Sequence, residues 1–572
     1  DIDTGIYSPS NGQIAFSTDG TERLKIDETG AITFTGSLDF SDAQGNTRVG
    51  TSAGDAFDGT NPVSNTLIGS GAGKLITTGD HNTVVGHNAL DASVTASQST
   101  AIGKSALGAT TTGTNTAVGY YALSGNTTGS GNTGLGNHAL SSNTEGQYNV
   151  AIGHEALKLN TASSNTAVGY KAGDAITTGD LNVAIGTNSM GVNVDGDRNV
   201  AVGANSLYFY DPASNQDSYN VAVGAYAGFS DTVGKENTFV GGSAANGLTE
   251  GNQNVAVGTY ALDASSGTGD ANTGVGWKAL SANTSGSSNT TLGYQAGLTE
   301  TDADNNVAIG RNALRLNVNG DDNTAVGTYA LDANTASDNT AVGYAAATSN
   351  TTGTENTALG YQAFYTNVDG SKSTAVGYKA LYNSDPASAI DTMNVAVGYN
   401  AGIAVTTGTS NVLIGSLAGD GIQASTKNVA VGHNALSGAV DSDGLATAIG
   451  YNTLANNTAA WCTAIGSQAL QSNSTGEKNV AVGHAALYTN TTGGYNVAVG
   501  TGSLQTLNHA DADYNTAIGH GAGSGITEGN YNVAIGPAVL DATGGTGTHN
   551  VGIGYAALSA CTSGTKHVAV GT

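Results

Sequence analysis

Apolar and polar positions follow one phrase along most of the chain, Asn-x-Ala-(Val/Ile)-Gly, which recurs about every 17 residues. The x-Ala-Val core of this phrase alternates with the two-residue period of a β-strand. Between copies lie segments such as Thr-Thr-Gly-Asp, Asn-Thr-Thr-Gly and Val-Asp-Gly-Asp, whose Gly, Asn and Asp residues tolerate left-handed turn conformations. The pattern therefore predicts short strands separated by turns.

The glycine of the phrase marks 30 copies, which are spaced almost evenly along the chain. The residue before this glycine is Val, Ile or Leu in all of them, and the residue four before it is Asn in 25. Ala stands three residues after the glycine in 24 of the 29 copies that extend so far, often followed by Leu. A degenerate copy at residues 46–50 is a candidate for the first member of the series.

A period of about 17 residues is too short for a propeller blade, an ankyrin unit or a tetratricopeptide unit, but it has room for two short strands and two turns. We therefore predict an all-β fold, a β-solenoid of the parallel β-roll type with about 17 residues per coil and some 30 coils. At about 4.8 Å per coil, the stack would form a rod of roughly 140 Å. Residues 1–45 are predicted to form a short N-terminal β module, and residues 46–572 the repeat shaft.

Each recurring position receives a structural role in this fold. The aliphatic residue before the glycine, such as Val168 or Ile185, is expected to stack on its counterparts and form the core. Asn is expected at a turn, where its side-chain amide bonds to the next coil and builds a ladder. Ala and Gly suit places where another backbone comes close, and they would leave flat stripes on which sister chains could pack.

A second level of repetition is visible in two longer intervals between repeat glycines. Both contain Asp-Pro-Ala-Ser, at residues 211–214 and at residues 385–388. The offset that carries residue 211 onto residue 385 also maps the glycines of residues 119–276 onto those of residues 293–450. The chain has therefore grown by duplication of a block of ten coils, which suits a shaft better than a catalytic pocket.

The repeats resemble those of two families of fibrous proteins. Phrases such as NVAVG and NTAIG are similar to the head repeats of trimeric autotransporter adhesins, the YadA-like heads, although that family has shorter coils. The longer phrases NTALGYQAFYT (356–366) and NTAVGYYALSGNTTG (115–129) more closely resemble repeats of phage tail fibres. Residues 4–34 also resemble a short β module of such fibres. The resemblance implies a homotrimer, which agrees with the small core that a lone thin coil can bury.

From this resemblance we expect a structural protein of the virion and not an enzyme: the shaft of a phage tail fibre, acting as a rigid spacer and adhesion element in host-cell attachment. Its expected partners are two sister chains, other fibre or baseplate proteins, and a host receptor that binds a tip outside this chain. One alternative is the stalk or head of a bacterial trimeric adhesin at the cell surface. Another is a self-assembling extracellular filament protein.

Composition and charge narrow the range of partners. The 572 residues include 85 Gly but only 11% charged residues, and the formal net charge is −27. An acidic surface of this kind repels phosphate backbones and anionic lipids, so we expect no nucleic-acid partner and no membrane insertion. The apolar runs of the sequence are all too short to span a bilayer. The chain begins at Asp1 and stops within a phrase at Thr572, so we expect it to be a processed or partial segment.

Several groups of residues are candidates for sites of chemistry, and none predicts a catalytic or cofactor-binding centre. The glycine-rich string at residues 69–73 lacks the Lys-Ser/Thr of a phosphate-binding loop and falls on the repeat's own glycine. Cys462 and Cys561 are far apart in the chain, which excludes a CxxC metal site and favours two small packed residues. Five histidines follow repeat glycines, and surface decoration is favoured over a zinc site, which needs convergent ligands. They are His87, His154, His433, His484 and His520.

Two further groups could bind ligands at the surface. Tyrosines after the repeat glycines could form a sugar-binding stripe, but packing on adjacent coils is the favoured interpretation. They are Tyr120, Tyr121, Tyr170, Tyr294, Tyr344, Tyr361, Tyr378 and Tyr399. Acidic turns at residues 195–197 and 320–322 could hold Ca²⁺, a hard ion that prefers clustered oxygens. They lack the nonapeptide of calcium-binding rolls, and Asp-Gly is ordinary turn chemistry, so no metal site is predicted.

Overall fold

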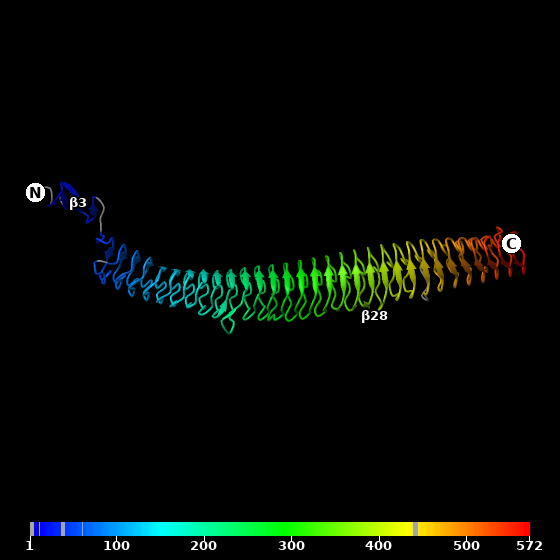
Figure 1. Cartoon of the computed structure of the whole chain (residues 1–572), viewed down its shortest axis with the longest axis horizontal. Helices are drawn as coiled ribbons and strands as arrows, with labels where there is room; N and C mark the ends of the chain where they lie inside the picture. The colour runs from blue at the N-terminus through cyan, green and yellow to red at the C-terminus, as the bar shows by residue number, and fades with distance from the viewer. Residues whose placement is uncertain (1–4, 11, 36–39, 60, 439–443) are drawn as a thin grey trace. The chain divides into compact units, whose positions relative to one another are not determined.

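The computed structural model describes residues 5–10, 12–35, 40–59, 61–438 and 444–572, and all their regular elements are β-strands (Figure 1). The chain forms two compact units. The first consists of residues 1–199 together with 213–217, and the second of residues 200–212 together with 218–572. The predicted all-β class and the parallel β-solenoid, with about 17 residues per coil, are confirmed.

The first unit opens with a four-stranded antiparallel sheet in the order β1-β2-β3-β4. Its strands are β1 (Gly5–Tyr7), β2 (Ile14–Thr18), β3 (Thr21–Ile26) and β4 (Ile32–Phe34). Nine stacked parallel strands follow, each paired with the next along the chain. They are β5 (Thr47–Val49), β6 (Thr66–Ile68), β7 (Thr83–Val85), β8 (Thr100–Ile102), β9 (Thr116–Val118), β10 (Thr133–Leu135), β11 (Val150–Ile152), β12 (Thr166–Val168) and β13 (Val183–Ile185).

The second unit contains 22 strands of the same kind, one per coil and in parallel register. They are β15 (Val200–Val202), β17 (Val221–Val223), β18 (Thr238–Val240), β19 (Val255–Val257), β20 (Thr273–Val275), β21 (Thr290–Leu292), β22 (Val307–Ile309), β23 (Thr324–Val326), β24 (Thr340–Val342), β25 (Thr357–Leu359), β27 (Thr374–Val376), β29 (Val395–Val397), β30 (Val412–Ile414), β31 (Val429–Val431), β32 (Thr447–Ile449), β33 (Thr463–Ile465), β34 (Val480–Val482), β35 (Val497–Val499), β36 (Thr516–Ile518), β37 (Val533–Ile535), β38 (Val551–Ile553) and β39 (Val568–Val570).

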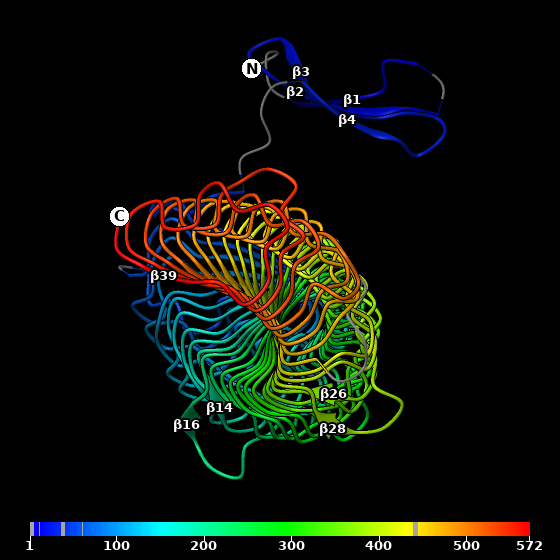
Figure 2. The ribbon, with the colours of Figure 1, turned by 90° about the vertical axis from the view of Figure 1, so that its right-hand side faces the viewer.

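Two further strand pairs brace the inserted loops. In the first unit β14 (Gly196–Asp197) pairs in parallel with β16 (Gln216–Asp217), and in the second unit β26 (Gly370–Ser371) pairs with β28 (Ile390–Asp391). Each pair lies beside a projecting loop (Figure 2). The offset between the two inserts carries β14 onto β26 and β16 onto β28, so the duplicated sequence has kept the same local structure twice.

Most coils contain one three-residue strand, and not the two short strands for which the repeat length has room. Turns fill the remainder of the coil, and they are held by backbone hydrogen bonds from coil to coil. The amide of Leu123 donates to the carbonyl of Ala139 at 2.9 Å, and the amide of Thr127 donates to that of Thr144 at 2.9 Å. Turn backbone is thus bonded across coils much as strand backbone is, which satisfies polar groups that would otherwise be buried without partners.

The core is built from small side chains on the strand and from leucines on the opposite wall. The middle residue of the strand, Ala167 in β12, is fully buried, as are the Ala and Leu that follow the repeat glycine, such as Ala122 and Leu123. The expectation that the aliphatic residue before the glycine forms the core was wrong: Val168 is half-buried and Ile185 is 38% exposed. Side chains of a strand alternate between its two faces. The inward position is usually Ala beside the leucines, whereas Leu67, Phe239 and Leu413 fill it where a glycine lies close by.

The repeat glycine allows successive coils to approach one another closely, as predicted. Gly169 has φ +140°, and a Cβ atom there would lie 2.6 Å from the carbonyl oxygen of Gly186 in the next coil. Any larger residue would push the two coils apart. The Ala and Gly positions therefore contact the interior and the next coil, and the expected flat stripes of these small residues for sister chains are absent from the described surface.

The predicted asparagine ladder is confirmed, and its bonds run mainly to backbone groups. Asn165 is fully buried. Its backbone N–H donates to the side-chain oxygen of Asn149 at 2.9 Å, and its own side-chain oxygen accepts the backbone N–H of Asn182 at 2.8 Å. Its side-chain nitrogen donates to the carbonyl of Gly179 at 2.7 Å. Each Asn thereby ties three neighbouring coils together.

Candidate functional site: an uncharged strand face

The stacked strands present one continuous face to the outside of each stack. The first and third residues of each three-residue strand point away from the core because the middle residue points into it. The first position is Thr or Val in every stacked strand, and the third is Val, Ile or Leu. Ile102, Ile414 and Ile465, at the third position, are 38%, 39% and 39% exposed. We call these two columns the strand face.

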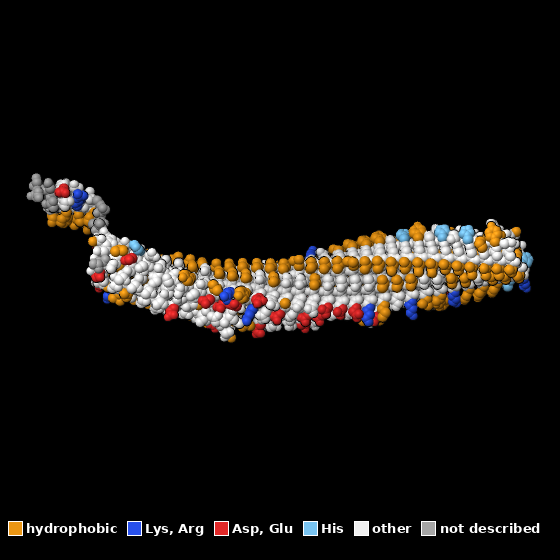
Figure 3. Space-filling model, in the orientation of Figure 1, with side chains coloured by type: hydrophobic (Ala, Val, Ile, Leu, Met, Phe, Trp, Pro, Cys, Tyr) orange, Lys and Arg blue, Asp and Glu red, His pale blue; other side chains and the backbone are white. Residues whose placement is uncertain are grey.

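No strand from β6 to β39 in either stack carries a charged residue, so the strand face is uncharged throughout. Hydrophobic side chains form rows that cross successive coils on the surface drawn in Figure 3. Monomeric soluble proteins seldom expose contiguous apolar patches beyond a few hundred Å², and larger ones usually mark an interaction surface. The strand face is therefore the candidate functional site of this chain.

Sequence reasoning missed this face because it assigned the larger aliphatics to the core. A signal was present in the strand position next to Asn, which holds only Thr or Val in the stacked strands. An ordinary solvent-facing strand position also accepts Lys, Glu or Gln, so this restriction distinguishes the strand face from an ordinary solvent-facing strand.

Aromatic columns run beside the strand face, in the position after the repeat glycine. Tyr344, Tyr361, Tyr378 and Tyr399 form one stack with ring centroids 5.2 to 5.3 Å apart and interplanar angles of 7° to 12°. The other tyrosines considered for a sugar-binding stripe also contact an aromatic ring of their own or an adjacent coil. The favoured prediction, packing between coils, is confirmed. Rings inside such a stack turn their edges outward, which leaves no ring face for a ligand.

The five histidines lie on the surface, as predicted. His154 stacks on Tyr170 at 5.5 Å and His433 on Tyr451 at 5.6 Å. The structure does bring His484 and His520 together, at a hollow of about 330 Å³ that Thr501 and Gln505 also line. Among the described residues, no group of three or more His, Cys, Asp or Glu side chains is placed to hold a metal ion.

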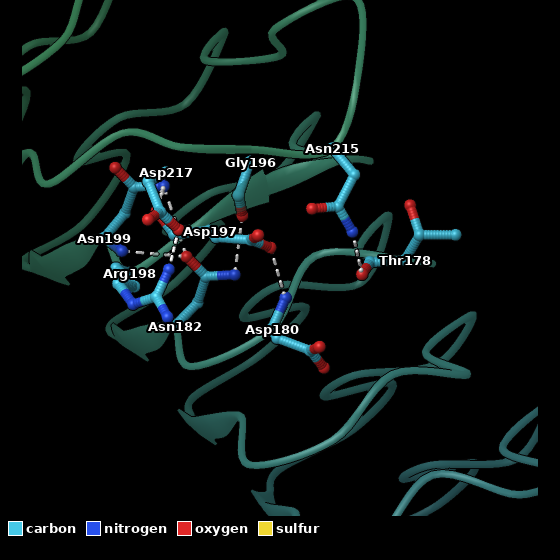
Figure 4. A network of polar contacts seen from close by, with 9 residues as sticks. All are labelled: Thr178, Asp180, Asn182, Gly196, Asp197, Arg198, Asn199, Asn215 and Asp217. Carbon is cyan, nitrogen blue, oxygen red and sulfur yellow. Dashed lines mark hydrogen bonds and ion pairs between the residues drawn. The ribbon is translucent and has the colours of Figure 1, made fainter.

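The acidic turn at residues 195–197 is occupied by the protein's own hydrogen-bond donors (Figure 4). Asp197 accepts the amide of Asp180 at 2.7 Å, and the hydroxyl of Thr178 donates to Asp195. Arg198 forms an ion pair with Asp217, at the base of the inserted loop. Burial raises the pKa of Asp197 above its ordinary value. These carboxylates hold coils and loop together.

The acidic turn at residues 320–322 shows the same use of carboxylates. Asp321 accepts the amide of Asp304 in the preceding coil at 2.8 Å, and the amide of Asp321 itself donates to the hydroxyl of Ser337 at 3.0 Å. Asp and Ser both occupy this column because either side chain offers an oxygen to the backbone N–H of its neighbour. The column is a structural ladder.

The remaining candidates are structural as well. Residues 69–73 form the turn after β6, and their glycines have positive φ. Cys462 occupies an Asn position, is fully buried, and donates its thiol to the carbonyl of Gly476 at 3.2 Å; burial raises its pKa to about 11. Cys561 is half-buried, and its sulfur lies 3.6 Å from Nδ1 of His567. Both cysteines are free thiols.

The part of the chain that the structure describes contains no helix that could span a lipid bilayer. Comparisons with models of known protein families, with curated proteins and with solved structures find no match to this chain. Its function is therefore inferred from the geometry of the strand face and from the resemblance of the repeats to fibre proteins.

Proposed function

We propose that this chain is a structural fibre element that associates with two further copies through the strand face and acts as a rigid spacer. One observation carries the proposal: the 30 stacked strands from β6 to β39, without the four loop strands, place only Thr, Val, Ile and Leu on the outer face of their stack. Burying such side chains against another chain removes apolar surface from water, which stabilises association by about 25 cal/mol per Å² before entropic costs.

Three copies suit this face because each chain would shield the face of the others from solvent. The coils are tied by strand bonds, turn bonds and Asn bonds, so bending one coil against the next breaks several bonds together. Such stiffness suits a spacer. The likeness of the repeats to phage tail fibres favours a spacer in a virion fibre, where it would hold an attachment tip away from the particle.

Self-association is tested by measuring the mass of the full chain in solution by light scattering after gel filtration. We expect three chain masses for the native protein. The variant Ile414→Glu/Ile449→Glu/Ile465→Glu adds three charges to the strand face, at side chains that are 38% to 39% exposed. We expect it to lose association and to keep the circular dichroism spectrum of a β-protein.

A matched control adds the same three charges to exposed turn residues of nearby coils, as Thr407→Glu/Ala424→Glu/Thr475→Glu. We expect this control to remain associated. A native chain that is already monomeric at micromolar concentration would contradict the proposal. Equal masses for the control and the strand-face variant would show that the strand face is not the interface.

A further inference from the structure

A cluster of four aromatic rings lies on the turn segments of two consecutive coils in the second unit. Tyr208 and Phe229 stack at 5.5 Å with an interplanar angle of 16°. Phe209 packs edge-on against both, at 4.8 Å from Tyr208 and 5.0 Å from Phe229, and Tyr226 packs against Phe229 at 5.4 Å. All four follow repeat glycines by two to six residues and lie outside the strands that form the strand face.

The cluster is open to solvent. Phe209 and Tyr226 are each 44% exposed, and Tyr208 and Phe229 are half-buried. Aromatic rings of this size normally bury about 150–250 Å² each when covered. Leaving two of them nearly half exposed costs solvation free energy, which a bound ligand would recover.

The following coil leaves one side of the cluster without a ring. In that coil Ser243 and Asn246 occupy the positions that Tyr226 and Phe229 hold in the coil before. The two coils are adjacent, because the N–H of Ser243 donates to the carbonyl of Ala225 and the N–H of Ser230 donates to the carbonyl of Asn246. At Gly242, a Cβ atom would meet nothing within 4 Å. The aromatic stack therefore ends beside small polar groups, unlike the column of Tyr344 to Tyr399, whose inner rings have a ring on both sides.

Size and charge narrow the class of ligand. A stable protein partner needs about 800 Å² of surface per side, which is far more than these four rings expose. The net charge of −27 disfavours an anionic ligand. A small neutral molecule with one apolar face and a polar edge fits best, because the rings offer apolar faces and the tyrosine hydroxyls, Ser243 and Asn246 offer hydrogen bonds along the rim.

We propose that Tyr208, Phe209, Tyr226 and Phe229 form a binding site for a neutral pyranose residue of a carbohydrate. The axial C–H groups of a pyranose ring carry partial positive charge and form an apolar face, which complements the negative face of an aromatic ring. Its hydroxyl groups lie at the ring edge, where the polar rim would meet them. This site goes beyond the proposed spacer function and does not depend on association of the chains.

The duplicated block supplies a natural control. At the offset that relates the two blocks, the equivalents of Phe209, Tyr226 and Phe229 are Asn383, Asn400 and Ile403, while Tyr208 is matched by Tyr382. These equivalents belong to coils with the same repeat phrase and the same Asp-Pro-Ala-Ser insert. The substitutions Phe209→Asn, Tyr226→Asn and Phe229→Ile therefore introduce residues that an equivalent coil already accommodates.

The probe is an array of neutral oligosaccharides that contain glucose, galactose, mannose and N-acetylglucosamine, incubated with the fluorescently labelled full chain. We expect the native protein to bind a subset of the array, and the triple variant to bind the same glycans at least tenfold more weakly with an unchanged melting temperature. If the triple variant fails to fold, the single substitution Tyr226→Asn is measured in its place. A reverse graft of both the rings and the polar rim, Asn383→Phe/Asn400→Tyr/Ile403→Phe/Leu417→Ser/Asp420→Asn in the triple variant, should restore binding at the second block.

Absence of any binding by the native chain would overturn the proposal, and so would native-like binding by the folded triple variant or by the Tyr226→Asn variant. A monomeric native chain that still binds the array would contradict the proposed spacer function and leave the sugar site standing. A trimer that binds no glycan would contradict the sugar site and leave the proposed spacer function standing.

Discussion

At the scale of single residues, each strand has one inward and two outward side chains, and the two classes should respond differently to a charge. Ala167→Asp places an unpaired carboxylate in the core, where the parent methyl group is fully buried. We expect this variant to open the coils around β12 at a cost of more than about 3 kcal/mol. Hydrogen exchange of amides in β11 to β13 would measure the opening.

The adjacent substitution Val168→Asp is the control, because Val168 is half-buried on the outer side of the same strand. Its carboxylate would remain hydrated. When both proteins are measured as dissociated single chains, hydrogen exchange of the amides in β11 to β13 should therefore be close to that of the native protein. Equal exchange in the two variants would contradict the inward placement of Ala167.

The alternation itself could be predicted from the sequence, but its direction could not. Both Ala and Val are apolar, and a period of two is the same whichever residue points inward. Hydrophobicity alone favours Val168 in the core. The outcome depends on the opposite wall, where Leu123 and its counterparts fill the interior; a Cβ atom at Gly134, on a strand, would already lie 3.3 Å from the Leu123 side chain.

Two buried carboxylates provide a test of pH dependence at the residue scale. Burial raises the pKa of Glu300 to about 8 and that of Asp231 to about 7. In an unfolded chain the pKa of Glu is about 4.3. Between about pH 4.3 and about pH 8, Glu300 keeps its proton in the folded chain and has lost it in the unfolded chain. The free energy of unfolding therefore falls as pH rises through this range and levels off above about pH 8.

The variant Glu300→Gln should remove this contribution, because its amide stays neutral and can still accept from Asn317, whose side-chain nitrogen lies 3.4 Å from Glu300 Oε1. We expect the variant to gain stability over the native chain as pH rises from about 5 to about 8, by about 1.4 kcal/mol for each pH unit. Denaturant unfolding across this range measures the difference. A constant difference between variant and native protein would show that Glu300 does not titrate in this range.

At the scale of the repeating element, the Asn ladder is interrupted at two consecutive coils. Ala446 and Cys462 stand where other coils have Asn, and both are buried. The amide of Ala446 still donates to the side-chain oxygen of Asn428 at 3.0 Å, but its methyl group passes no hydrogen bond to the next coil. The double variant Ala446→Asn/Cys462→Asn should complete the ladder.

We expect this double variant to raise the free energy of unfolding by about 1 kcal/mol per hydrogen bond restored, provided that the added side-chain atoms fit as they do in neighbouring coils. Urea unfolding of the native and variant chains measures the gain. The conservative control Cys462→Ser keeps the small size and only replaces the thiol that donates to the carbonyl of Gly476 by a hydroxyl donor, so it should give a smaller change. A loss of stability in the double variant would show that the coils here have closed around the smaller residues.

Of the element-scale features, the Asn ladder could be predicted because stacked identical coils bring like residues into register. The hydrogen-bond partners of each Asn could not be predicted, since most of the bonds of Asn165 involve backbone groups. One strand in place of two also escaped prediction. The turn segments carry the same Gly, Asn and Thr residues whether their backbone pairs as strand or as stacked turn, so only the three-dimensional arrangement separates the two.

At the scale of the whole molecule, the duplication of ten coils is visible in structure as well as in sequence. Lys372 pairs with Asp391 at 2.7 Å at the base of the second loop, just as Arg198 pairs with Asp217 at the first. The offset between the two blocks carries each member of the first pair onto its counterpart in the second. Coils of a solenoid contact mainly their neighbours, so whole blocks can be gained or lost in register.

Deletion of residues 203–376 tests this modularity, because it joins Val202 to Gly377 and replaces one block by its equivalent. The shortened chain should fold and keep the β-sheet spectrum per residue. It should also form a new ion pair between Arg198 and Asp391, which the substitution Asp391→Asn would remove. Circular dichroism and limited proteolysis of the shortened chain measure these outcomes.

The control deletes residues 203–384, so that only residues 385–394 remain between Val202 and the start of β29. This link is shorter than the segment of residues 136–149 that joins β10 to β11, and it cannot complete a coil. The control should therefore be sensitive to proteases at the junction. Equal protease resistance of the two deletions would show that coil length does not govern folding, because a solenoid that closes by nearest-neighbour contacts must fail at a coil that is too short.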